Sequence, residues 1–194
     1  MVKGETVPCT KEEIDALLNV AIKDEFYYMM FKVAIKTGRR LGEYWGVKNR
    51  VTGEWEGGVK VSDIDFERGV MMTRVLKRKR RIEKEAILND EIINLVKSYV
   101  SRNGLKLDDY LFRKVSMRQI QYKVEYCARK AKINHKVTFH NFRHYFVTEL
   151  FKKGWTYDKI AKLTGHSTVS TLAVYDHSVA SDIAADAREA IRDL

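Results

Sequence analysis

Residues 140–178 have the sequence HNFRHYFVTELFKKGWTYDKIAKLTGHSTVSTLAVYDHS, which carries most of the information about the fold and the chemistry. The stretch contains His140 and Arg143 three residues apart, His166 after a glycine, and Tyr175 at the end of an apolar run. All five histidines of the chain lie in this stretch or just before it. Imidazole carries protons near neutral pH, and a guanidinium binds phosphate oxygens through paired donors. With a phenol beside them, these groups indicate cleavage of a phosphodiester without a metal ion.

The HNFRH segment alone permits simpler interpretations. His140 and Arg143 share a helix face at this spacing, but such a pair is typical of an ordinary surface helix. His140 and His144 have the i, i+4 spacing of some zinc sites. The segment lacks the glutamate that follows the first histidine in metalloproteases, and no cysteine or carboxylate cluster is near. It therefore does not predict a zinc site.

Residues 157–175 are compatible with two interpretations. Two short helices joined at Gly165 are typical of a helix-turn-helix, whose second helix would enter a DNA groove. A helical corner within an enzyme has the same pattern. Tyr175 follows apolar residues, where an aromatic ring is usually buried with its hydroxyl at the rim. These residues alone leave both a DNA-reading element and a catalytic tyrosine open.

The composition predicts a globular, reduced protein. At 194 residues with 45% hydrophobic residues and one proline, the chain can bury the core of a single domain. Cys9 and Cys127 are too few and too far apart to indicate a disulfide framework. No run has the length of a membrane span and no secretory signal opens the chain, so we expect a cytoplasmic protein without a membrane partner.

The charge of the chain indicates a polyanionic partner. Lysine and arginine number 36 against 26 acidic residues, which gives a net charge of +10. Such an excess attracts nucleic acid without regard to sequence, although solubility alone can also account for it.

The hydrophobic periodicity predicts a mainly α protein with a small three-stranded antiparallel β-sheet, an α+β fold. Thr10 and Glu13 form a capping box before the first helix, and Thr37-Gly38 ends the second. A short helix carrying Arg40 and Glu43 should follow, and then a polar loop over residues 48–58. Strands are predicted at 59–66, 70–77 and 81–88. Further helices are predicted at 11–24, 25–36, 90–102, 116–131, 138–153, 157–164, 168–175 and 179–192.

Taken together, these motifs resemble the catalytic domain of the tyrosine recombinases, the phage integrase family. TGRRLGE (37–43) is similar to the first arginine box of that family, and VSDIDF (61–66) to the strand after it. Residues 140–154 resemble the second arginine box of the family, and LTGHS (163–167) resembles its continuation. VYDHS (174–178) resembles the tyrosine box. The resemblance covers about residues 10–180 and makes the helix-turn-helix interpretation less favoured.

The resemblance implies a role for each candidate residue. Tyr175 would attack the scissile phosphate and form a 3′-phosphotyrosyl link, so that rejoining needs no nucleotide cofactor and no metal. Arg40 and Arg143 would clamp the non-bridging oxygens, because forked donors suit phosphate. His166 would donate to the same oxygens, and His140 would assist as donor or acceptor. Glu43 would hold the first arginine in position.

A lysine at the tip of the β-hairpin would protonate the 5′-oxygen that leaves. Counting back from Leu88 selects Lys79, whereas counting forward from Gly69 selects Lys77. The family usually has an apolar residue where this chain has Arg39, so register alone assigns Arg40 to the phosphate. About a dozen residues, 48–59, are inserted before the sheet and have no assigned role.

The resemblance also implies an organisation and partners. Residues 1–194 are expected to be a single catalytic domain without the amino-terminal core-binding domain of the family, since the helix at 11–24 already corresponds to the start of the catalytic domain. Residues 179–194 have the pattern of an amphipathic helix that could be exchanged with a neighbouring protomer. The expected partners are double-stranded DNA, in the nucleoid, and further copies of the chain in a dimeric or tetrameric synapse, with no small-molecule substrate. A type IB topoisomerase and a non-enzymatic DNA-binding protein are the alternatives.

Overall fold

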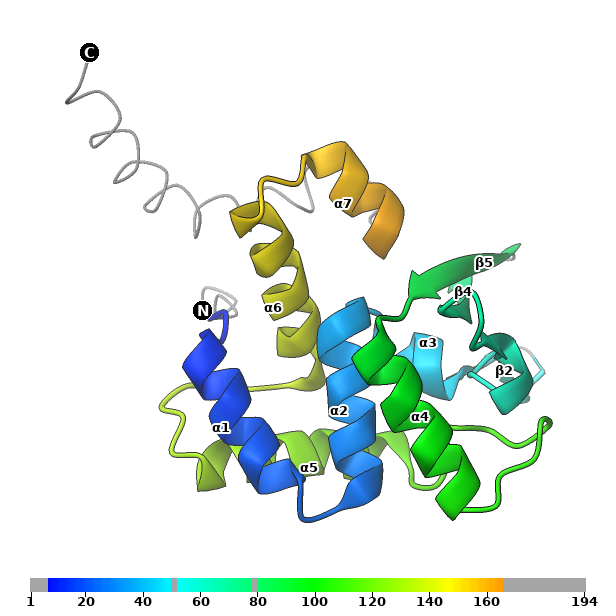
Figure 1. Cartoon of the computed structure of the whole chain (residues 1–194), viewed down its shortest axis with the longest axis horizontal. Coiled ribbons are helices and arrows are strands. Elements are labelled where there is room, and N and C mark those ends of the chain that lie inside the picture. The colour runs from blue at the N-terminus through cyan, green and yellow to red at the C-terminus, as the bar shows by residue number, and fades with distance from the viewer. Residues whose placement is uncertain (1–6, 50–51, 78–79, 166–194) are drawn as a thin grey trace.

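A computed structural model describes residues 7–49, 52–77 and 80–165. A helical body stands beside a small sheet, and helix α2 runs through the middle of the body (Figure 1). The helices are α1 (Lys11–Ala21), α2 (Glu25–Thr37), α3 (Leu41–Trp45), α4 (Asp90–Arg102), α5 (Met117–Lys130), α6 (Phe139–Lys152) and α7 (Tyr157–Thr164). The strands are β1 (Val47–Lys48), β2 (Trp55–Glu56), β3 (Ile64–Asp65), β4 (Val70–Lys77) and β5 (Arg80–Ile87). The predicted mainly α fold with a three-stranded antiparallel sheet is confirmed; the helices predicted at 168–175 and 179–192 lie outside the described residues.

Capping residues fix where the first two helices begin and end. The Thr10 hydroxyl accepts from the Glu13 N–H and the Glu13 carboxylate accepts from the Thr10 N–H, which completes the predicted capping box. The first helix ends at Ala21 rather than residue 24, because the Asp24 side chain caps the next helix through the Tyr27 N–H. Gly38 ends α2 in the left-handed conformation with φ +61°.

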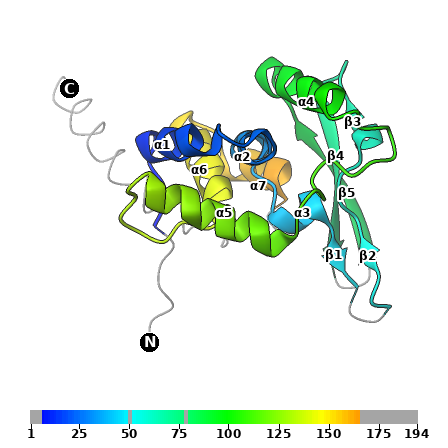
Figure 2. The same ribbon diagram turned by 90° about the horizontal axis from the view of Figure 1, so that it is seen from below.

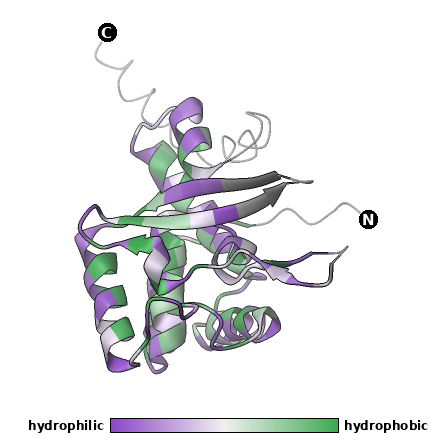
Figure 3. Cartoon of the chain, turned by 90° about the vertical axis from the view of Figure 1, so that its right-hand side faces the viewer, coloured by the Kyte–Doolittle hydropathy of each residue, from purple (hydrophilic) through white to green (hydrophobic). Residues whose placement is uncertain are grey.

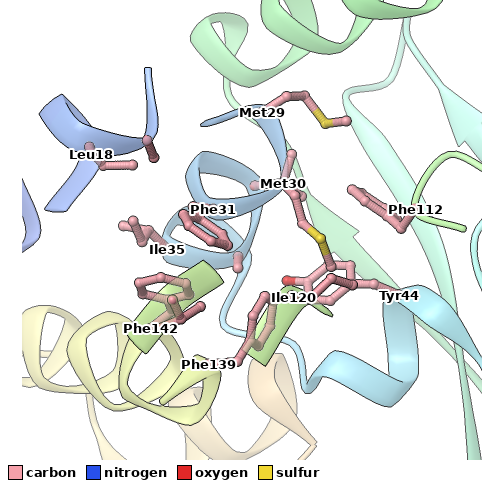
Figure 4. Packing of buried hydrophobic residues seen from close by; sticks show 14 of the residues in the cluster. Leu18, Met29, Met30, Phe31, Ile35, Tyr44, Phe112, Ile120, Phe139 and Phe142 are labelled. Atoms are coloured by element: carbon pink, nitrogen blue, oxygen red, sulfur yellow. The ribbon is translucent and has the colours of Figure 1, made fainter. Parts of the chain in front are cut away.

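Helix α2 is the centre of the core because nearly every turn is apolar on more than one face. It packs against α1, α4 and α6. Figure 4 shows Met30, Phe31 and Ile35 of α2 facing rings from other elements. Phe31 lies 5.1 Å from Phe142 of α6 between ring centroids. Burial of such large side chains against several elements fixes the position of α6 relative to α2.

The sheet has the order β3-β4-β5, and all neighbours are antiparallel. Strand β3 pairs only with the first two residues of β4, so the rest of β4 and β5 form a two-stranded ribbon. Figure 2 shows this hairpin beside the helical body. Much of the strand predicted at 59–66 is instead the 3₁₀-helix η1 (Val61–Asp63). The Asp63 carboxylate caps that turn by accepting from the Lys60 N–H at 2.8 Å, which the period-2 pattern did not indicate.

The predicted loop at 48–58 is wrong in part, because β1 and β2 form a short antiparallel hairpin there. Trp55 stacks edge-to-face on Trp45 of α3 with ring centroids 4.5 Å apart. Arg113 donates to the backbone carbonyls of Trp45 and Gly57 at 2.8 and 2.9 Å, so long-range contacts hold the insertion in place. Only two residues in each strand are paired, too few to give a strand signal in the sequence.

Hydrophilic and hydrophobic residues alternate around the helices, as expected for helices with one buried face (Figure 3). In the part of the chain that the structure describes, no helix has the length and apolar character needed to cross a membrane.

Candidate active site

The turn between α2 and α3 presents two adjacent arginines in opposite environments. Arg40 precedes α3, and its side chain is 43% exposed. Its Nη1 lies 3.2 Å from Oε1 of Glu43, whose side chain is buried. Arg39 is only 2% exposed and points into the protein. Arg40 is therefore the one of these two adjacent arginines that reaches solvent, and the Glu43 carboxylate supports it.

Arg143 of α6 joins this turn to the end of α7. Its Nη1 donates to the carbonyl oxygen of Gly38 at 2.8 Å and to that of Thr164 at 3.0 Å. The side chain is almost wholly buried. Thr164 is the last residue of α7 and lies two positions before His166. A single guanidinium thus fixes the first arginine turn and the segment leading to the predicted histidine in one place.

His140 lies beside both arginines. It is in the first turn of α6, and its ring packs edge-to-face on His144 with centroids 4.8 Å apart. Partial removal from water lowers the pKa of His140, and the positive charges of Arg143 and Arg40 lower it further. Burial, with His140 and Arg143 nearby, lowers the pKa of His144 to about 4. His144 is therefore uncharged near neutral pH. The lowered pKa of His140 favours its neutral form, which can accept a proton or donate a hydrogen bond.

The remaining predicted residues lie at the edge of the described part or outside it. Lys77 is the last residue of β4 and pairs in register with Arg80, which places it at the hairpin tip, although its side chain is not described. Lys79, His166 and Tyr175 lie outside the described residues. The structure thus brings together Arg40, Glu43, His140 and Arg143, and the roles of these four residues, like those of the two lysines, the second histidine and the tyrosine, stay predictions.

Backbone groups complete the site, and the residue pattern did not identify them. The carbonyls of Gly38 and Thr164 accept from Arg143. Gly38 is itself a glycine in the left-handed conformation, and Thr164 precedes one, Gly165. The signal was present as Thr37-Gly38 and Thr164-Gly165, since a glycine after a helix exposes its last carbonyls. Nothing in the sequence shows that one arginine would reach both turns.

A second group of polar side chains lies away from this site. Cys9, Glu13 and His135 place their donor atoms within 4.8 Å of one another. The Glu13 carboxylate already receives the Thr10 N–H and lies 3.2 Å from Nε2 of His135. Burial raises the pKa of the Cys9 thiol to about 12, which keeps it protonated. We therefore interpret this group as a structural contact that holds the start of α1 against the segment before α6.

Comparison with known proteins agrees with the fold. The fold is that of the tyrosine recombinase catalytic domains: the crystal structure of XerA recombinase superposes with a TM-score of 0.75 at 26% identity, over 95% of this chain and 66% of that one. XerH recombinase bound to its palindromic difH substrate shares the fold, with a TM-score of 0.73 at 20% identity over 95% of this chain and 53% of that chain. Among curated proteins, tyrosine recombinase XerA of Pyrococcus furiosus is 27% identical over 185 residues, which are 90% of this chain and 58% of that protein.

A sequence model of the phage integrase family matches residues 9–181. The chain belongs to the phage integrase family, as the arginine and tyrosine boxes indicated. It spans a little over half the length of curated relatives that it matches.

Proposed function

We propose that this chain is the catalytic domain of a site-specific recombinase or integrase that cleaves and rejoins DNA strands through a 3′-phosphotyrosyl intermediate. The observation that carries the proposal is the position of Arg143. It donates to the turn that presents Arg40 and to the end of the helix that leads to His166. Two guanidinium groups and an imidazole would then surround one phosphate.

In the proposed reaction, the Tyr175 oxygen forms a bond to phosphorus and the bond to the 5′-oxygen breaks. Arg40 and Arg143 stabilise the extra negative charge on the non-bridging oxygens, with a hydrogen bond from His166. Uncharged His140 can take the phenolic proton, and a hairpin lysine gives a proton to the departing 5′-oxygen. The fixed cations supply charge stabilisation that other nucleases obtain from metal ions, so no metal or cofactor is required.

Double-stranded DNA is the proposed substrate, and the nucleoid is the proposed location. The net charge of +10 supports a polyanionic partner. The Tn1549 transposon integrase, which has the same fold with a TM-score of 0.65, is in complex with transposon right end DNA, which supports DNA as the substrate.

We also propose that copies of the chain assemble on DNA through residues 179–194, in dimers or a tetrameric synapse. That segment has four acidic residues and two arginines, and isoleucine, alanine and leucine recur in it at helical spacing. A groove between α1, α2 and α6 offers complementary chemistry. Apolar side chains line it together with four lysines (Lys11, Lys32, Lys36 and Lys153) and two acidic residues (Asp15 and Glu149), so its charge is net positive. The acidic amphipathic tail of a neighbouring copy fits this groove in charge and in polarity.

The test of the proposed function is capture of the covalent intermediate. A pool of nicked duplexes with randomised central sequence would be incubated with the protein in EDTA. Cleavage beside the nick releases a short strand and traps the protein on the DNA. We expect an adduct that survives SDS and that disappears in Tyr175→Phe. DNA binding without any adduct would instead identify a non-enzymatic DNA-binding protein.

The duplex sequence recovered from the adduct, called the trapped duplex below, is then used to decide which of the two candidate lysines is the general acid. Lys77→Ala and Lys79→Ala would be compared on this duplex and on the same sequence with a 5′-bridging sulfur, which leaves without a proton. The variant that lacks the general acid should be slow on the oxygen substrate and restored on the sulfur substrate. If both variants cleave ordinary DNA normally, neither lysine is the acid.

A further inference from the structure

Arg39 is a buried cation that the proposed chemistry does not use. It is 2% exposed, and its Nη2 donates to the backbone carbonyl of Glu85 in β5. Its Nε and Nη1 have no hydrogen-bond partner among the described residues. Its own N–H donates to the Tyr44 hydroxyl at 3.2 Å, so both ends of the residue are fixed. Burying a guanidinium so incompletely paired is costly, so the contact with β5 needs an explanation beyond stability.

The strand that Arg39 contacts belongs to a weakly supported hairpin. Strand β5 is at the edge of its sheet, and β3 supports only Val70 and Met71 of β4. An isolated two-stranded ribbon is only marginally stable in water, so its orientation depends on contacts at its base. From Glu85 to Arg80 the strand extends roughly 17 Å toward the tip, and a small rotation at the base becomes a larger displacement there.

Two further contacts fix the same part of the hairpin. Arg74 of β4 forms a paired interaction with Asp63, with Nη1 at 2.6 Å from Oδ2. On β5, the Lys84 side chain lies so close to Gly165 that a Cβ added to that glycine would be 2.5 Å from Nζ. Residues 84 and 85 thus contact the segment before His166 and the first arginine turn, respectively. The base of the hairpin thus contacts two segments that carry proposed site residues.

We propose that Arg39 is a positioning residue that holds the β4–β5 hairpin against the turn presenting Arg40, so that the hairpin lysine reaches the departing 5′-oxygen. This inference rests on the proposed function. Arg39 itself would touch neither the phosphate nor the leaving group. Its loss should therefore affect the step that needs the general acid and spare the steps that need the arginine clamp.

The test compares Arg39→Met with the wild type on the trapped duplex and on its 5′-bridging-sulfur version. Because general acid catalysis contributes about 10²–10⁴-fold, we expect Arg39→Met to be at least about tenfold slower on ordinary DNA. On the sulfur substrate its rate should return to near that of the wild type. Arg40→Met should stay slow on both substrates, because it removes a phosphate contact. If Arg39→Met does not fold, Arg39→Lys should show the same dependence on the leaving group in a milder form.

Arg68→Met is the matched control. Arg68 lies 3.6 Å from the carboxylate of the same Glu85, but its side chain is 66% exposed. We expect this variant to cleave both substrates like the wild type. Equal loss on both substrates in the Arg39 variant, or no loss on either, would overturn the positioning role. A wild-type protein that forms no adduct on either substrate would overturn the proposed function itself.

Discussion

At the scale of single residues, burial assigns different tasks to neighbours of the same chemical type. Arg39 and Arg40 are consecutive, yet one is buried against a strand and the other keeps 43% of its side chain in solvent. The difference arises because Arg40 immediately precedes α3, where Glu43 one turn later can pair with it. Glu43 is itself buried, so its charge acts on Arg40 with little screening by water.

The support from Glu43 can be tested with Glu43→Gln. Glutamine keeps an oxygen acceptor but removes the charge, which weakens the hydrogen bond that orients Arg40. A hydrogen bond to a charged group contributes about 1 kcal/mol more than a neutral one, so the cleavage rate should fall about fivefold. The measurement is the rate of adduct formation on the trapped duplex, with thermal unfolding as a check on folding.

Glu91→Gln is a suitable control for that experiment. Glu91 pairs with Lys32 on α2 but is 49% exposed and lies far from the arginine turn in the sequence. An exposed ion pair contributes little, so this variant should cleave at the wild-type rate. Equal effects of both substitutions would show that Glu43 acts through general stability and not through Arg40.

The lowered pKa of His144 predicts how the free energy of unfolding depends on pH. Its folded-state pKa of about 4 lies below the ordinary value of 6.5, so the unfolded chain binds the proton more readily. The contribution of the neutral His144 imidazole to the free energy of unfolding is complete above pH 6.5 and is lost as the pH falls toward 4. Urea unfolding of the wild type should lose roughly 2 kcal/mol between pH 7 and pH 5 from this group. His144→Gln should lose less over that interval, and equal losses would show that the imidazole is not held neutral.

The sequence predicted the charged residues of the site better than it predicted their partners. Spacing placed Arg40 and Glu43 on one short helix and His140 with Arg143 on another. The second placement is confirmed, and in the first the helix carries Glu43 but begins one residue after Arg40. Whether Arg39 or Arg40 would face solvent depends on how α3 packs, which a single sequence does not encode locally. The hairpin lysine stays a prediction for the same reason.

At the scale of the elements, the glycine that ends α2 allows α6 to approach the turn that presents Arg40. Gly38 has φ +61°, and its carbonyl accepts from Arg143. An added Cβ would lie 2.2 Å from Cδ1 of Phe146 on α6. The close approach of α6 to this turn therefore requires the absence of a side chain.

Gly38→Ala should both destabilise the protein and slow cleavage. Left-handed strain costs about 1 kcal/mol and displacement of Phe146 about 1–3 kcal/mol more. Gly104→Ala is the control, because Gly104 has the same φ of +61° and open space around it. It should lose only the strain energy and cleave normally. Urea unfolding and the adduct assay measure the two effects. Similar losses in both variants would contradict the requirement for a glycine where α6 approaches the turn.

Elements with a strong local signal were predicted, whereas those fixed by distant contacts were not. Helices α4 to α7 begin and end within one or two residues of the predicted bounds, because their caps and apolar stripes are local. The β1–β2 hairpin depends on Trp45 and Arg113, and η1 depends on the Asp63 carboxylate with its partner Arg74. The Arg113 contact with Trp45 joins residues far apart in the sequence, so no short window contains that signal. The cap of η1 by Asp63 is local, but the period-2 pattern there favoured a strand.

At the scale of the whole molecule, the site lies where the helical body meets the hairpin. Helices α2 and α6 are fixed by the core, while the ribbon of β4 and β5 is held mainly at its base (Figure 1). The helical body thus carries the proposed phosphate clamp and the hairpin carries the proposed acid. Faces of the body that do not contact the hairpin, including the groove of α1, α2 and α6, remain for assembly.

The proposed assembly can be tested by reversing charge at the edge of that groove. Lys11→Glu/Lys153→Glu replaces two exposed residues that would face the acidic tail of a neighbouring copy. Lys130→Glu/Lys132→Glu makes the same change in net charge at exposed positions away from the groove. General attraction to DNA should weaken equally in both, because it follows total charge. Native mass measurements of protein–DNA complexes should show about tenfold weaker multimer formation only in the groove variant, since each surface pair contributes up to about 1 kcal/mol. Equal weakening in the two variants would mean that these lysines act on DNA and that the tail binds elsewhere.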